Sequence, residues 1–129
     1  YFRVMDVKEN LKYTKDHEWV KLDGNIATVG ITDFAQGELG DIVYVEVDTV
    51  DETLDKDEVF GTVEAVKTVS DLFLPMSGKI IEFNDSLSDS PESINDSPYE
   101  KGWIIKVEVS NPEEINELLN NNDYSELIG

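Results

Sequence analysis

The stretch VFGTVEAVKTVSDLFLP, residues 59–75, places one lysine, Lys67, between two runs of apolar residues. Valine and phenylalanine stand on both sides of the lysine, and these residues favour β-strands. Pro75 has no amide hydrogen to give to a strand ladder, so the second run ends there. The stretch therefore predicts two strands joined by a turn at residues 65–67, with Lys67 at the tip of the hairpin.

A second hairpin is predicted by HEWVKLDGNIATVGI, residues 17–31. Asp23-Gly24 separates two alternating runs, and glycine adopts the positive φ that a tight hairpin turn needs. IVYVEVD, residues 42–48, alternates between apolar and polar residues and predicts a half-buried strand. Three valines are expected to share one face of that strand: Val43, Val45 and Val47.

The alternation of short strands and turns continues toward the C-terminus. KIIEFN (79–84) and WIIKVEVS (103–110) predict two more strands, and Trp103 is expected in the core. The acidic segment 48–58 and the polar segment 85–102 are predicted to be loops.

Two helical segments are expected around this β-rich centre. TDFAQGELGD (32–41) predicts a short helix that is capped by Thr32 or Asp33 and ends at Gly40. The tail, residues 111–129, predicts a C-terminal helix from its start signals and its apolar stripe: Asn111, Pro112, Glu114, Ile115, Leu118 and Leu119. Many short strands with peripheral helices indicate one all-β domain, a sandwich or barrel, over residues 1–129.

The charge balance limits the partners of the chain. Among 129 residues, 29 are acidic and 10 are basic, which gives a net charge of −19. Nucleic acid and anionic membrane surfaces repel such a chain. The charge fits either docking to basic protein surfaces or simple solubility, and composition does not separate the two.

Few residues are available for a metal site or for nucleophilic catalysis. The chain has no cysteine and one histidine, His17. The acidic segments lack the glycine that turns a calcium-binding loop between its ligands. No phosphate-binding glycine loop or nucleophile elbow occurs. We therefore expect no metal and no catalytic residues.

The N-terminal residues YFRVMDVKEN contain no signal-peptide apolar segment, and no stretch has the length of a membrane span. Met5 is expected to be the natural first residue, with Tyr1–Val4 added during cloning. These features predict a bacterial cytoplasmic protein, or a mitochondrial matrix protein if the source is eukaryotic.

Lys67 itself allows two interpretations. An ammonium group is a weak spontaneous nucleophile at neutral pH, so an acyl group reaches it only with the help of an enzyme. An acylated lysine would become the base of a long flexible arm on a rigid support. Most lysines at strand turns are simply solvated, so residue chemistry alone favours the solvated interpretation over the attachment point.

Several blocks of the sequence resemble one family over nearly the whole chain. These blocks are LKYTKDHEWV, ATVGITDFAQGELGDIVYVE, FGTVEAVKTVSDLFLPMSGKI and INDSPYEKGWIIKV. They are similar, in the same order, to those of the H proteins of the glycine cleavage system. Lys67 lacks the flanking methionines of biotin carriers and the Asp-Lys-Ala of 2-oxo acid dehydrogenase lipoyl domains.

The resemblance implies a barrel-sandwich hybrid that carries lipoic acid as an amide on Lys67. It implies that Glu64 is recognised by the lipoylating enzyme, a lipoate ligase or octanoyltransferase. Asp16, Glu18 and Asp71 match the polar lining of a cleft that shelters the aminomethyl-lipoyl arm. Three small departures from the family leave the attachment residue in place: Phe34, Ala65 and Thr68.

The function implied by the resemblance is that of a carrier and not of an enzyme. Its partners would be a pyridoxal-phosphate glycine decarboxylase, an aminomethyltransferase and dihydrolipoyl dehydrogenase. A relay that donates lipoate to other proteins, and an unmodified acidic interaction domain, remain as alternatives. His17 and Trp19 are expected to pack and hydrogen-bond, and three glycines to serve turns or close packing: Gly61, Gly78 and Gly102.

Overall fold

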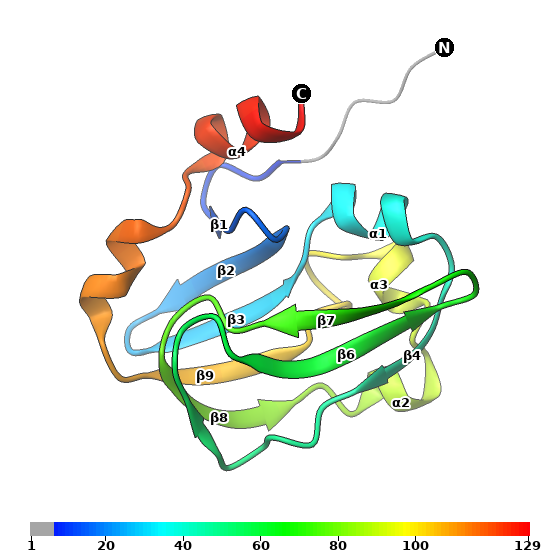
Figure 1. Cartoon of the computed structure of the whole chain (residues 1–129), viewed down its shortest axis with the longest axis horizontal. Helices are drawn as coiled ribbons and strands as arrows, with labels where there is room; N and C mark the ends of the chain where they lie inside the picture. The colour runs from blue at the N-terminus through cyan, green and yellow to red at the C-terminus, as the bar shows by residue number, and fades with distance from the viewer. Residues whose placement is uncertain (1–6) are drawn as a thin grey trace.

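The computed structural model describes residues 7–129, so Tyr1–Val4 and Met5 lie outside the described residues. Two antiparallel sheets form the centre of the structure (Figure 1). The larger has six strands, in the order β1 (Lys12–Tyr13), β2 (Glu18–Asp23), β3 (Ile26–Ile31), β9 (Ile105–Val109), β8 (Gly78–Phe83) and β5 (Thr53–Leu54). The smaller has three, in the order β4 (Ile42–Glu46), β6 (Val59–Ala65) and β7 (Val69–Phe73).

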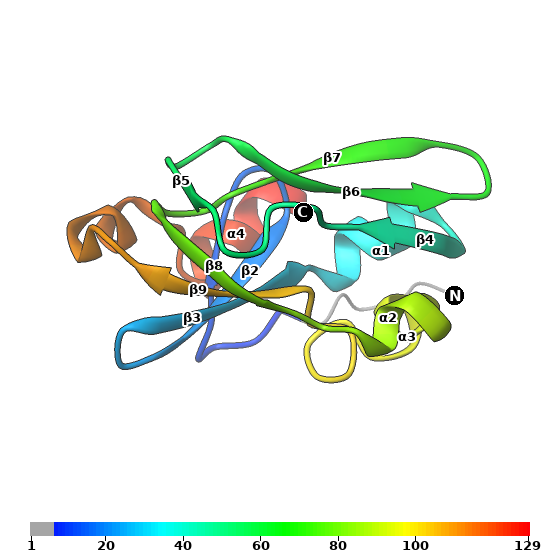
Figure 2. The same ribbon diagram turned by 90° about the horizontal axis from the view of Figure 1, so that it is seen from below.

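The two sheets face each other and enclose the main core. Figure 2 shows β6 and β7 as one layer and β3, β8 and β9 as the other. Phe60, Leu74 and Ile80 are among the largest buried side chains between the layers. Neither sheet closes on itself, and short helices lie at the periphery. The all-β prediction, a barrel-sandwich hybrid with peripheral helices, is confirmed.

The β6–β7 hairpin forms as the opening stretch predicts. The Ala65 amide donates to the Thr68 carbonyl at 2.8 Å and closes the turn around Lys67. The Val66 amide donates to the carbonyl of Asp41 at 3.1 Å, which ties the tip to the loop after α1 (Asp33–Leu39). The turn is therefore held from two sides, and Lys67 projects from a fixed backbone.

Two glycines illustrate the predicted close packing. A Cβ on Gly61 would lie 2.5 Å from the Glu46 carbonyl oxygen of the neighbouring strand. A Cβ on Gly102 would lie 2.8 Å from the Cα of Ile94. Gly78 is equally confined, against the Glu108 carbonyl. All three positions therefore exclude any larger side chain without movement of backbone.

The prediction that three valines share one face of β4 is wrong. Val45 is buried, whereas Val43 is 46% exposed. The pairing of β4 with β6 shifts register between Ile42 and Tyr44, and such a bulge moves the following side chains to the other face. The prediction of Trp103 in the core is also wrong, because β9 begins at Ile105 and Trp103 is only partly buried against a second cluster.

Two predicted loops contain regular structure. The polar segment 85–102 forms two one-turn helices, α2 (Ser86–Asp89) and α3 (Ser93–Asp96). Each of these helices buries one apolar residue, Leu87 or Ile94. The acidic segment 48–58 contains β5. A segment that is polar in composition therefore contains regular structure, and side-chain hydrogen bonds of Asn84 and Asn95 also hold it to the rest of the fold.

The C-terminal segment is helical, as the sequence predicts, but it forms two short helices instead of one continuous helix. Pro112–Glu117 forms a 3-10 helix, η1, capped by Asn111, and the regular helix α4 spans Asn121–Ile128. The Glu114 carboxylate does not complete a capping box. Instead it accepts hydrogen bonds from the amide and hydroxyl of Ser77, at 2.8 and 3.1 Å. No helix within residues 7–129 is long and apolar enough to cross a bilayer.

Candidate functional site

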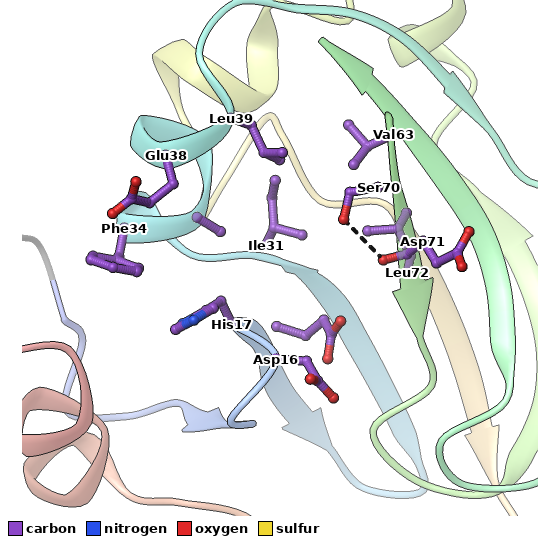
Figure 3. A pocket seen from close by; sticks show the side chains of 12 residues that line it. Asp16, His17, Ile31, Phe34, Glu38, Leu39, Val63, Ser70, Asp71 and Leu72 are labelled. Carbon is purple, nitrogen blue, oxygen red and sulfur yellow. Dashed lines mark hydrogen bonds between the residues drawn. The ribbon is translucent and has the colours of Figure 1, made fainter. Parts of the chain in front are cut away.

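A cavity of about 350 Å³ lies between α1, the first residues of β2 and strand β7 (Figure 3). Asp16, Glu18 and Asp71, the three residues predicted to line a cleft, all belong to its lining. The Phe73 amide of β7 donates a hydrogen bond to the Glu18 carboxylate, 55 residues away in the sequence, and so joins β7 to the start of β2. The structure therefore brings the predicted cleft residues together.

Glu18 is the buried acid of this cleft, with 2% of its surface exposed. Its carboxylate accepts a hydrogen bond from the Thr14 hydroxyl at 2.7 Å and one from the Phe73 amide at 3.3 Å. Burial raises the pKa of Glu18 to about 8, although these two hydrogen bonds act in the opposite direction. The negative charges of Asp16 and Asp57 raise the pKa further. The carboxyl is therefore protonated at neutral pH in the folded protein.

Asp16 and His17 form the turn that leads into β2. The Thr14 hydroxyl accepts hydrogen bonds from the amides of Asp16 and Glu18, at 3.2 and 3.1 Å. His17 has a φ of 70°, which is uncommon for a residue with a side chain. Asp16 is exposed at the cleft rim. Burial is the main reason why the pKa of His17 lies below its usual value, with Asp16 and Glu38 acting against it.

Asp71 lines the cleft through its backbone. In Figure 3 its carboxylate points away from the cavity, on the opposite side of β7 from Ser70. The strand pairing agrees, because Asp71 stands beside Thr62 of β6 and its neighbour Leu72 is buried. The Ser70 hydroxyl lies 3.4 Å from the Asp71 carbonyl oxygen. Asp71 therefore offers the cleft a main-chain carbonyl in place of the charge expected from the sequence.

The remaining lining is largely apolar and was missed by sequence reasoning. It includes six apolar residues: Ile31, Phe34, Ala35, Leu39, Val63 and Leu72. Glu38 also belongs to the lining and is exposed. Phe34 with Glu38, and Ala35 with Leu39, are spaced four residues apart on α1, so each pair lies on one helix face. This spacing was a usable signal for the α1 wall.

Two residues of the predicted site lie outside the cavity, near the hairpin tip. Lys67 is exposed, and its Cε lies 3.6 Å from the place a Cβ on Gly40 would occupy. Glu64 is exposed on β6, paired with Tyr44 on one side and Val69 on the other. Lys67 is not among the residues that line the cavity, but Gly40, which its side chain approaches, directly follows the lining residue Leu39.

The structure also accounts for His17 and Trp19. The Trp19 indole donates to the Pro98 carbonyl at 2.9 Å, and its ring is buried. His17 Nδ1 lies 2.8 Å from the Tyr124 hydroxyl, and its ring lies 4.9 Å from that of Phe34. Both packing predictions are confirmed. Among residues 7–129 no three His, Asp or Glu side chains group as metal ligands.

Comparison with known families decides the relationship of the chain. The family model described as glycine cleavage H-protein matches residues 11–129. The chain belongs to this family. Membership makes it a lipoate carrier of the glycine cleavage system and not an enzyme.

Individual relatives in the H-protein family are similar over almost their full length. The glycine cleavage system H proteins of Staphylococcus saprophyticus and Staphylococcus epidermidis are each 55% identical over 125 residues, 97% of this chain and 99% of the relative. The crystal structure of an H protein from Mycobacterium marinum matches with a TM-score of 0.87 at 38% identity. That match covers 95% of this chain and 99% of the other.

Proposed function

We propose that Lys67 bears a lipoyl group in amide linkage and that the cleft shelters this arm when it is loaded. The observation that carries the proposal is the buried carboxyl of Glu18 in a largely apolar cavity that is partly lined by β7, the second strand of the Lys67 hairpin. Such a cavity suits an apolar chain that ends in a cation. Lys67 would attach the chain, and Glu18 would meet its charged end.

The tip is suited to attachment. Its turn is closed by backbone hydrogen bonds, so the lysine amine stands on a fixed support. Glu64, three residues before Lys67, projects from the outer face of the hairpin. A lipoylating enzyme, either a lipoate ligase or an octanoyltransferase, would have to cover this tip. We assign Glu64 as a contact for that enzyme.

The lipoyl group, when bound, supplies a pair of sulfur atoms that carries the aminomethyl group and two electrons. The residues of this chain bind the arm, exclude water and hold a proton. Glu18 holds its proton in the folded protein because burial disfavours the charge. A cation bound beside it would favour the carboxylate, so Glu18 would then release its proton to water. The carbonyl of Asp71 and the carboxylate of Asp16 lie at the same cavity as further acceptors.

The partners follow from the carrier role. They are the pyridoxal-phosphate glycine decarboxylase, the aminomethyltransferase and dihydrolipoyl dehydrogenase. A tethered arm raises the effective concentration of its cargo at each of these enzymes. The relatives reported above are bacterial, which supports the bacterial cytoplasm over the mitochondrial matrix as the compartment.

Intact-mass spectrometry tests the attachment directly. The protein is co-expressed with a lipoate ligase, beside the variants Lys67→Arg and Lys79→Arg. The wild type and Lys79→Arg should gain one lipoyl mass, and Lys67→Arg none. Equal gain in Lys67→Arg, or no gain in the wild type, refutes the proposal. Exchange of glycine with CO2 by the decarboxylase then separates the cleavage-system carrier from a dedicated lipoate relay, which would not support exchange.

A further inference from the structure

The hydroxyl of Tyr124 lies within hydrogen-bond distance of residues from two walls of the cleft, although Tyr124 does not itself line the cleft. Tyr124 lies on α4, and its hydroxyl is 2.8 Å from His17 Nδ1 and 2.7 Å from the Thr32 hydroxyl. His17 lies in the turn before β2, and Thr32 caps the N-terminus of α1. These contacts span 107 and 92 residues of sequence. The C-terminal helix thus reaches both sides of a site to which it contributes no lining residue.

The two partners of Tyr124 are also joined to each other. The Thr32 amide donates to the His17 carbonyl at 3.0 Å, so the three residues form a closed triangle of hydrogen bonds. Each wall partner is next to cleft-lining residues. His17 lies between Asp16 and Glu18, and Thr32 directly follows Ile31. A change in these three hydrogen bonds would therefore shift residues that line the cleft.

Tyr124 is itself placed by packing. Its ring is fully buried and stacks on Tyr13, with centroids 4.6 Å apart and ring planes 7° apart. The segment before α4 is fixed to the same strand, because Tyr13 and Leu119 exchange both backbone hydrogen bonds at 2.8 Å. Figure 1 shows α4 beside β1, the edge strand of the larger sheet. The stack positions the ring, which leaves the hydroxyl to hold His17 and Thr32.

We propose that Tyr124 is a positioning residue, whose hydroxyl sets the separation of the β2 turn and α1 and thereby the closure of the cleft over its occupant. The inference rests on the proposed function only in naming that occupant. The geometry of the walls is a property of the chain without its arm. Removal of the hydroxyl leaves the Thr32–His17 backbone bond, so we expect the walls to loosen and not to separate.

The test compares Tyr124→Phe with Tyr13→Phe. Both variants keep a ring in the same stacked pair and lose one phenol oxygen. The Tyr13 hydroxyl donates to the Lys8 carbonyl at 2.8 Å, and Tyr13 does not belong to the lining of this cavity. In protein without lipoate, hydrogen exchange of the Thr32 amide should be about fivefold faster in Tyr124→Phe, as expected for the loss of one neutral hydrogen bond. The ring nitrogen shifts of His17 should change as well, since Nδ1 loses its partner.

The second readout uses lipoylated, loaded protein. Hydrolytic loss of the aminomethyl group should be several-fold faster in Tyr124→Phe and unchanged in Tyr13→Phe, at matched thermal stability. Equal exchange and equal hydrolysis in the two variants, or the same increase in both, overturns the inference. Absence of a lipoyl mass on Lys67 would instead refute the proposed function, while the exchange experiment would still decide the role of Tyr124.

Discussion

Replacement of Glu18 by glutamine should remove the pH dependence of stability that the buried carboxyl causes. Glutamine has nearly the same shape but only one oxygen, which can accept from the Thr14 hydroxyl or from the Phe73 amide, because these two bonds end on different carboxylate oxygens of Glu18. It carries no charge at any pH. The wild-type carboxyl must either stay protonated in the folded protein or ionise in a site where only 2% of its surface is exposed.

The direction of the pH dependence follows from the raised pKa. The pKa of Glu18 is about 8 in the folded protein, against a reference value of 4.5. Between these values the folded state binds more protons than the unfolded state, so stability falls as pH rises through this window. Above pH 8 the loss is complete, and below pH 4.5 it is absent. The penalty reaches roughly 3 kcal/mol at pH 7 and between 4 and 5 kcal/mol above pH 8, as an order of magnitude.

The measurement is the free energy of unfolding in urea, at pH values from 5 to 9, for wild type, Glu18→Gln and Glu52→Gln. Glu52 is exposed and serves as the matched control. The difference between wild type and Glu52→Gln should stay nearly constant. The difference between wild type and Glu18→Gln should grow by about 2 to 3 kcal/mol from pH 5 to pH 7. A difference that stays flat from pH 5 to pH 9 would show that Glu18 is ionised throughout, and the argument from burial would fail.

Three further outcomes are expected. Asp71→Asn should leave hydrolysis of the loaded arm unchanged, because the Asp71 carboxylate points away from the cleft. Glu18→Gln should accelerate hydrolysis, because Glu18 lines the cleft. A large effect of Asp71→Asn would mean that its side chain turns inward. Gly30→Ala should lower the free energy of unfolding by roughly 1 to 3 kcal/mol in urea titrations, since the new Cβ would lie 2.6 Å from the Trp19 indole nitrogen. Glu64→Gln should slow lipoylation about tenfold in a timed mass assay while leaving stability unchanged, and an unaltered rate would remove Glu64 from the recognition surface.

The strands and their turns were predictable because their signals are local. The Asp23-Gly24 turn and the Lys67 hairpin depend on residues a few positions apart, and both formed as expected. The bulge in β4 was not predictable, because alternation assumes an unbroken register. The helices α2 and α3 were missed because each has only one buried residue, and one apolar residue in a polar segment gives no period.

The candidate site also has parts that the sequence predicted and parts that it did not. Lys67 and the cleft residues came from the resemblance of sequence blocks, and the structure assembles Asp16, Glu18 and Asp71 around one cavity. The direction of the Asp71 carboxylate depends on strand register, which blocks of sequence do not specify. The contact between His17 and Tyr124 spans 107 residues and joins a turn to a terminal helix. No local pattern marks such a pair.

Glu18 is the most informative residue of the site, because it is a glutamate in a buried position where an apolar residue is the usual choice. A glutamate in a buried position destabilises the native state unless it is paired, and no basic side chain is among its partners within the described residues. Its two hydrogen bonds reduce the penalty but do not remove it, since the pKa remains raised. A cation in the cleft would supply the missing partner. The free energy that the protein loses by burying Glu18 would then be regained when a cationic cargo is sheltered, so retention of the cargo should strengthen as Glu18 loses its proton.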